Sequence, residues 1–107
     1  MPFDAFDVAL DLIRALREPL ATISRRDPDL AQQLRRAAAS VPLNLSEGRR
    51  RNGKDRLHLW RIAAGSADEV VASLRVAEAW GHVDAAAIAQ PLALCDRILA
   101  MTWRLTR

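Results

Sequence analysis

The side chains in this chain that could do catalytic or metal chemistry are few and lie far apart. The 107 residues include two histidines, His58 and His82, which are 24 positions apart with no second histidine or carboxylate pair at ligand spacing. The adjacent acids Asp68 and Glu69 would point to different sides of a helix, so they cannot converge on one substrate as an acid and a base. We therefore expect no catalytic residue, no metal site, no cofactor and no enzymatic activity.

Cys95 is the only cysteine, which excludes an internal disulfide and a cysteine-based metal cluster within one chain. Its helical neighbours are apolar, so it is most simply a small core residue. The N-terminal segment carries Asp4, Asp7 and Asp11 where a signal peptide needs positive charge, and no apolar run approaches the roughly 18 residues of a membrane span. These features predict a cytoplasmic protein with no membrane partner.

Basic residues form the most conspicuous cluster in the sequence. The net charge is only +3, but residues 49–61 hold six basic residues against one acid, Asp55, a local charge of +5. The six are Arg49, Arg50, Arg51, Lys54, Arg56 and Arg61. Such a run is either a solvated helix end or a surface that contacts phosphate groups, and the charge pattern leaves both interpretations open.

The composition predicts an all-α fold and a single domain over residues 1–107. Hydrophobic residues make up 50% and charged residues 27%, with 4 Gly and 5 Pro, which is typical of an ordered domain. Apolar periodicity places helices at about 4–25, 28–50, 53–80 and 84–106. The connections are so short that successive helices must be antiparallel, which predicts an up-down-up-down four-helix bundle.

Turn and cap signals mark the helix ends. Asp27 precedes Pro28 as a candidate N-cap of the second helix, and Asn52 and Asp84 are candidate caps of the third and fourth. Gly81 is expected to end the third helix.

Proline lies inside three of the predicted helices. Pro19 is expected to bend the first helix, and Pro91 to kink the fourth or to mark its effective start. The apolar stripe of the second helix keeps its phase across Pro42, which favours a kinked helix over a loop. The expected stripes are Phe6, Ala9, Ile13, Leu16, Leu20 and Ile23 in the first helix, and Leu30, Leu34, Ala37 or Ala38, Val41 and Leu45 in the second.

The third and fourth helices are apolar over a broad arc. The third carries one stripe of Leu57, Trp60, Ala64, Ala67, Val71 and Leu74, and beside it a second of Leu59, Ile62, Ala63, Ser66, Val70 and Ala77. The fourth carries Ile88, Leu92, Cys95 and Leu99 beside Leu94, Ile98, Met101 and Leu105. Such a helix is either central to the bundle or has a second apolar partner, such as another subunit.

Asn44 and Glu47 are polar residues in an otherwise apolar stretch, close to the arginine run. Buried polar groups need partners, so these two residues are expected to form hydrogen bonds or ion pairs that fix helix packing or a subunit contact. A functional alternative is that Glu47 orients an arginine toward a ligand phosphate.

The stretch "QLRRAAASVPLNLSEGRRR" followed by "LWRIAAGSADEVVASLRVAEAWGHVD" resembles the bacterial four-helix-bundle family that includes proteins encoded in 23S rRNA intervening sequences. It is also similar to the accessory variability determinants of diversity-generating retroelements. The matching motif positions are Gln33, Leu34, Arg35, Arg36, Ala37, Ser40, Val41, Asn44, Leu45, Ser46, Glu47 and Gly48, and later Ala63, Gly65 and Ser66. The family's usual arginine in the second motif is Ala64 here. The resemblance is specific over about residues 33–84.

The resemblance implies a bundle that assembles into a ring-shaped homopentamer. It also implies a basic surface that binds nucleic acid, RNA or DNA, and in retroelement members a partner reverse transcriptase. Our leading hypothesis is a non-enzymatic oligomeric nucleic-acid-binding protein in which the six basic residues of 49–61 contact phosphates. The alternative is a protein-binding adaptor with no nucleic-acid contact. Packing and assembly are assigned to Ser40, Pro42, Asn44, Glu47, Gly48, Gly65 and Ser66.

Overall fold

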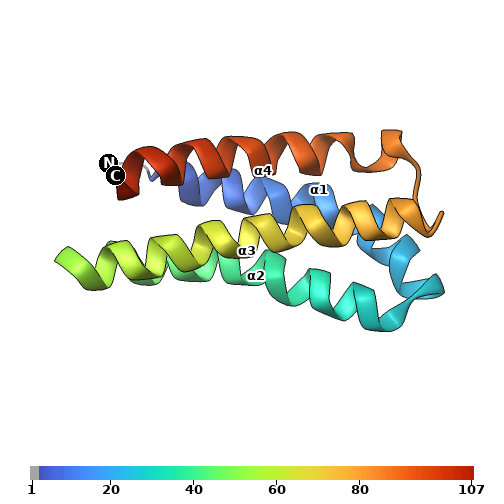
Figure 1. Ribbon diagram of the computed structural model, residues 1–107, viewed down its shortest axis with the longest axis horizontal. Helices are drawn as coiled ribbons and strands as arrows, with labels where there is room; N and C mark the ends of the chain where they lie inside the picture. The colour runs from blue at the N-terminus through green and yellow to red at the C-terminus, as the bar shows by residue number, and fades with distance from the viewer. Residues whose placement is uncertain (1–2) are drawn as a thin grey trace.

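The computed structural model describes residues 3–107 and consists of four helices in an up-down-up-down arrangement (Figure 1). The helices are α1 (Asp4–Arg26), α2 (Pro28–Arg49), α3 (Gly53–Ala79) and α4 (Ala85–Thr106). Each helix packs on the one before it, and α4 closes the bundle against α1. The predicted all-α fold is confirmed, and the helix ends agree with the predicted ranges to within one residue.

Local signals in the sequence account for most of the helix ends. The Asp27 carboxylate accepts a hydrogen bond from the Leu30 amide, and the Asp84 carboxylate accepts one from Ala87, so both act as N-caps. Gly81 adopts φ +80° after α3, where the amide of the next residue bonds back into the last turn. Asn52 is different: it holds the N-cap position of α3, but its side chain makes no cap hydrogen bond to any described residue. The prediction that Asn52 caps α3 through its side chain is wrong.

Pro19, Pro42 and Pro91 all lie inside helices and are buried. Each ring removes one hydrogen bond to the carbonyl four residues earlier, at a cost of ~3 kcal/mol or more in an isolated helix. Burial of the ring in the core offsets part of that cost. The prediction that α2 continues through Pro42 is confirmed. Pro91 does not mark the start of α4, which begins at Ala85.

The core runs the length of the bundle, and the α2 stripe is buried as predicted. The α1 stripe is displaced: Phe6, Ile13 and Leu20 are only partly buried, and the buried positions are Ala5, Val8, Ala9, Leu12, Leu16, Pro19 and Ile23. In α3 the buried face lies between the two predicted stripes and contains residues of both. Its buried apolar residues are Trp60, Ala63, Ala67, Val70, Leu74 and Ala77. The margin of the second stripe, at Ile62, is left exposed.

α4 is long and apolar enough to cross a membrane by length and composition, so the expectation that no such stretch exists is wrong for residues 85–106. The bundle gives another reason for this composition. Ile88, Cys95 and Ile98 are fully buried against the other helices. Asp96 and Arg97 interrupt the apolar run near its middle and face outward.

The antiparallel arrangement decides which turns share an end of the bundle. The α2–α3 turn lies at the same end as the start of α1 and the end of α4, and the α2–α3 hairpin extends beyond both of these helix ends (Figure 1). The α1–α2 and α3–α4 turns lie at the opposite end. The basic run of residues 49–61 is therefore joined by the last turn of α4.

Candidate nucleic-acid interface

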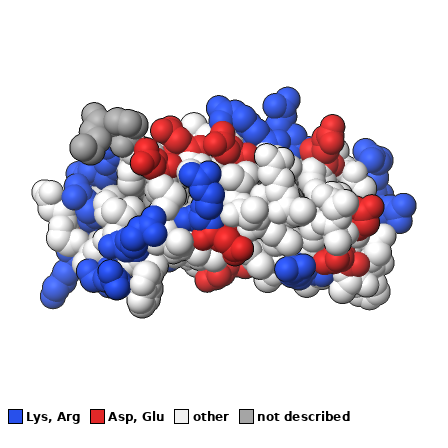
Figure 2. All heavy atoms as spheres, turned by 90° about the horizontal axis from the view of Figure 1, so that it is seen from above, with Lys and Arg blue, Asp and Glu red and all other residues white. Residues whose placement is uncertain are grey.

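Basic side chains from three helices and one turn gather at a single end of the molecule. We call it the basic end and define it by Arg49, Arg50, Arg51, Lys54, Arg56, Arg61, Arg104 and Arg107. In the face shown in Figure 2, several blue side chains lie close together at the left-hand end, whereas blue and red side chains are mixed farther along the bundle. The acid within the 49–61 run, Asp55, lies in the first turn of α3, where the helix dipole favours it.

The α2–α3 turn is closed by backbone bonds and one glycine. The amides of Arg50 and Arg51 donate to the carbonyls of Glu47 and Gly48, at 3.1 Å and 3.0 Å. Gly53 opens α3 with φ +56°, a conformation that side-chain-bearing residues rarely adopt. The tight turn brings the three consecutive arginines and the start of α3 together.

Arg56, in α3, donates hydrogen bonds to two carbonyl groups at the end of α2. Its Nε donates to the carbonyl of Gly48 at 3.2 Å and its terminal nitrogen to the carbonyl of Arg49 at 3.0 Å. These carbonyls lie in the last turn of α2 and have no partner within that helix. The guanidinium also lies 5.3 Å from the centre of the Trp60 ring. Arg56 therefore positions the turn, and its charge is partly used inside the fold.

Trp60 is the buried anchor beneath the basic end. Its indole N–H donates to the carbonyl of Leu45 at 3.1 Å, and its ring lies 5.5 Å from that of Phe3. Gly48 allows this packing: a Cβ built there would lie 2.6 Å from two atoms of the Trp60 ring. The structure thus places Gly48 at a close approach between α2 and α3.

The other basic residues differ in how much of their charge is already engaged. Arg51 pairs with Glu47 at 2.7 Å on the exposed surface, and Arg61 donates to the carbonyl of Thr106 at 3.0 Å. The Arg49 guanidinium lies 5.6 Å from the centre of the Phe3 ring. Arg50 and Lys54 are exposed and form no side-chain hydrogen bond or ion pair with other described residues. Of the six basic residues in 49–61, these two are the ones most open to a ligand.

Three motif residues form a hydrogen-bonded contact between α2 and α3. The Asn44 amide donates to the carbonyl and to the hydroxyl of Ser40, both at 2.9 Å, and the Ser66 hydroxyl donates to the Ser40 hydroxyl at 2.7 Å. Asn44 thus has the packing partners expected of it. Glu47 instead pairs with an arginine on the surface, an arrangement compatible with its functional alternative. Gly65 lies beside this contact and is exposed.

Three residues at this end of the bundle were missed in the sequence: Arg104 and Arg107, which belong to the basic end, and Trp103 beside them. Trp103 is 63% exposed, and the guanidinium of Arg107 lies 5.9 Å from the centre of its ring. The bonded pair of Arg61 and Thr106 joins α3 to this last turn of α4. The predicted antiparallel order could have revealed them, because it puts the end of the fourth helix beside the start of the third.

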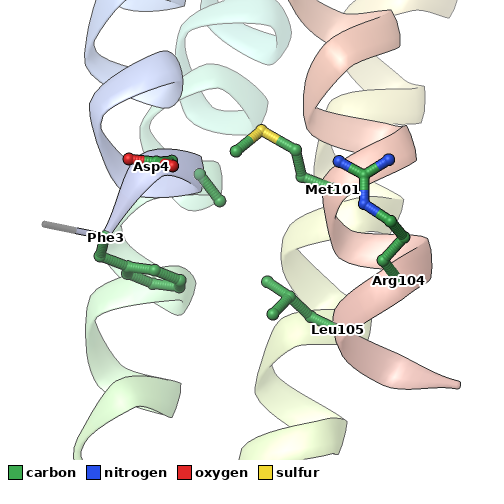
Figure 3. Close-up of a pocket in the computed structure, with 6 residues that line it drawn as sticks. Phe3, Asp4, Met101, Arg104 and Leu105 are labelled. Carbon is green, nitrogen blue, oxygen red and sulfur yellow. The ribbon is translucent and has the colours of Figure 1, made fainter. Parts of the chain in front are cut away.

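A shallow hollow lies between the start of α1 and the end of α4 (Figure 3). Phe3 and Leu105 point toward each other across it, with Met101 above, and Asp4 and Arg104 lie at its sides. Its volume of about 240 Å³ is below the range typical of small-molecule sites. Among the described residues that line it, no pair of titratable groups is placed for acid–base chemistry.

The residues considered for catalysis lie apart. Burial raises the pKa of the Cys95 thiol to about 12, and the carboxylates of Asp96 and Asp68 add to the shift, so at neutral pH the thiol is protonated and a poor nucleophile. His82 lies 3.4 Å from the Asp27 carboxylate at the far end, and His58 is exposed on α3. Across residues 3–107, no group of three or more His, Cys, Asp and Glu is placed to hold a metal ion.

The fold and its basic end define a class of protein: an antiparallel four-helix bundle with a cationic end and, among its described residues, no group placed to hold a metal ion. The family model of the 23S rRNA-intervening sequence protein matches residues 4–104, and the chain belongs to that family. A crystal structure of a protein of unknown function from the S23 ribosomal protein family of Bacteroides thetaiotaomicron has the same fold. It has a TM-score of 0.84 and 14% sequence identity, with 96% of this chain and 98% of that chain covered. No curated protein sequence matches the chain.

Proposed function

We propose that this protein is a non-enzymatic, homo-oligomeric helical bundle that binds nucleic acid through its basic end. The observation that carries the proposal is the convergence of cations from α2, the α2–α3 turn, α3 and α4 on one end of the molecule. Phosphate contacts by such a surface release condensed counterions, so the binding is tolerant of sequence and steeply dependent on salt. Repetition of the surface in an oligomer raises the avidity.

Arg50 and Lys54 provide the sharpest test, because their side chains have no partner among the described residues that a substitution would remove. We expect the double variant Arg50→Ala/Lys54→Ala to bind short RNA and DNA duplexes more weakly and with a salt slope less negative by about 1 to 2, up to ~0.9 per lost phosphate contact. The matched control is Arg25→Ala/Arg26→Ala, which removes two exposed arginines at the other end of the bundle. Equal binding by wild type and both double variants at two salt concentrations excludes the basic end as the interface.

Exposed apolar side chains on α2 and α3 support the homo-oligomeric part of the proposal. Leu43 is 67% exposed and Val76 44% exposed. Leu43 and Ile62 lie about one turn from Ser40 and Ser66, so they flank the hydrogen-bonded contact between the two helices. A ring of five copies is what the sequence resemblance implies, and native mass spectrometry tests it: a monomer contradicts the proposal.

The same exposed residues favour a second candidate, a protein-binding adaptor. Recovery of a specific protein by pull-down after nuclease treatment, without any direct RNA or DNA binding, supports the adaptor. A reverse-transcriptase partner stays a prediction from the resemblance.

A further inference from the structure

Trp103 is an exposed aromatic residue in the last turns of α4. Its side chain is 63% exposed, although a tryptophan gains more from burial than other side chains do. Arg107 is one turn farther on and holds its guanidinium 5.9 Å from the ring centre. Arg61 of α3 is fixed to the same turn through the Thr106 carbonyl at 3.0 Å. An exposed indole ring thus lies beside the Arg107 guanidinium, and Arg61 of α3 is hydrogen bonded to the same turn of α4.

A second exposed tryptophan gives an internal comparison. Trp80 is 72% exposed at the opposite end of the bundle, where its ring stacks on His82 at 6.4 Å between ring centres. His82 in turn faces the Asp27 carboxylate at 3.4 Å. The two tryptophans are similarly open to solvent, but in the described part of the chain an arginine guanidinium lies beside the ring of Trp103 and none beside that of Trp80.

We propose that Trp103 is a stacking platform for an unpaired nucleobase, with Arg61 and Arg107 contacting the neighbouring phosphates. This deepens the proposed function and rests on it: the basic end would take single-stranded RNA or DNA in preference to a duplex. A base in a single strand can offer its π-face to an aromatic side chain, whereas a base inside a duplex has both faces covered. Charge then attracts the strand, and the indole selects strands with free bases.

The test compares binding of a labelled oligothymidylate of about 12 nucleotides with binding of a duplex of the same length. We expect Trp103→Ala to weaken single-strand binding by about 5- to 100-fold, the range for loss of one stacked base, and to change duplex binding by less than about 2-fold. Trp103→Phe keeps a ring and should retain most of the affinity. The salt slope should stay as in wild type, because no phosphate contact is removed.

The matched control is Trp80→Ala, which removes an equally exposed ring away from the arginines and should bind as wild type does. Fluorescence gives a second readout: in a Trp80→Phe background, oligothymidylate should quench emission, and adding Trp103→Phe should abolish the quenching.

The outcomes separate the two proposals. Equal single-strand binding by Trp103→Ala and Trp80→Ala overturns the stacking platform and leaves the proposed function standing. Failure of wild type to bind either probe overturns both. A change of oligomeric state in Trp103→Ala alone, measured by sedimentation, assigns the residue to a contact between copies of the chain and overturns the platform as well.

Discussion

The two ends of the bundle hold their turns together in different ways. At the far end, the hydrogen bonds that hold the helix ends are local: Asp27 and Asp84 each cap the helix that follows, and Gly81 closes α3 with amides bonded to the turn before it. The Asp27 carboxylate also faces His82 of the α3–α4 turn at 3.4 Å. At the basic end, longer-range contacts are added to the backbone bonds of the turn. The carbonyls of Gly48 and Arg49 accept hydrogen bonds from Arg56, seven to eight residues away, and the Leu45 carbonyl accepts one from the Trp60 indole, fifteen residues away.

The difference shows how one end can carry both structure and charge. Because Arg56 and Trp60 hold the α2–α3 turn from beneath, the turn itself does not need a capping side chain, and Asn52 makes no such bond to a described residue. Arg50 and Lys54 are then left exposed to solvent. Within one basic run, some cations stabilise the fold and others are open to a ligand.

Replacing one tryptophan at each end of the bundle should give the largest difference in stability between the two ends. Trp60→Ala is expected to lower the free energy of unfolding by about 3–5 kcal/mol, because it opens a cavity and removes the indole hydrogen bond to the Leu45 carbonyl. Trp80→Ala, at an exposed position, should stay within about 0.5 kcal/mol of wild type. Urea denaturation followed by far-UV circular dichroism measures both. Similar losses in the two variants contradict the long-range account of the basic end.

Two glycines give a matched pair of opposite sign. Gly48→Ala forces a methyl group to 2.6 Å from a Trp60 ring that is itself hydrogen bonded, and the strain should exceed the gain of ~0.5–1 kcal/mol in helix propensity. We expect a net loss of about 1–2 kcal/mol. Gly65→Ala places its Cβ within 4 Å of no described atom other than its chain neighbours and the backbone of its own helix, so it should stabilise α3 by ~0.5–1 kcal/mol. Thermal melts of the two variants should therefore shift in opposite directions, and a shift in the same direction argues against the close approach at Gly48.

The fold was predictable because its signals are local. Apolar periodicity, Asp27 and Asp84 as caps, and Gly81 as a stop are each read within a few residues, and each acts as predicted. The errors arise where tertiary packing decides. The α1 stripe is displaced because the neighbours of a helix determine which side of a broad apolar arc is buried.

The candidate site was predictable only in part for the same reason. The run of residues 49–61 is visible as a charge cluster, but its division into structural and exposed cations depends on contacts that periodicity does not contain. From the sequence, Arg56 is indistinguishable from a surface cation, because its hydrogen bonds to the α2 carbonyls depend on how α2 and α3 pack. The position of Trp103 beside the basic end follows only from the packing of α4 against α3.

The smallest losses of stability are expected at the far end, where they test whether the local N-cap or a distant contact stabilises the structure. Asp27→Ala removes the acceptor for the Leu30 amide and should cost about 1 kcal/mol, the usual value for loss of an N-cap. Asp27→Asn keeps an acceptor oxygen and removes only the negative charge that faces His82, a partly exposed pair at 3.4 Å, so it should cost a few tenths of a kcal/mol.

Asp84→Ala, which removes a second N-cap from an exposed position at the same end, provides the reference value of about 1 kcal/mol. Chemical denaturation of the three variants under identical salt resolves these differences. If Asp27→Asn were as destabilising as Asp27→Ala, the charge facing His82 would outweigh the cap. Both ends of the bundle would then depend on contacts between distant parts of the chain, and the two ends would differ only in their charge.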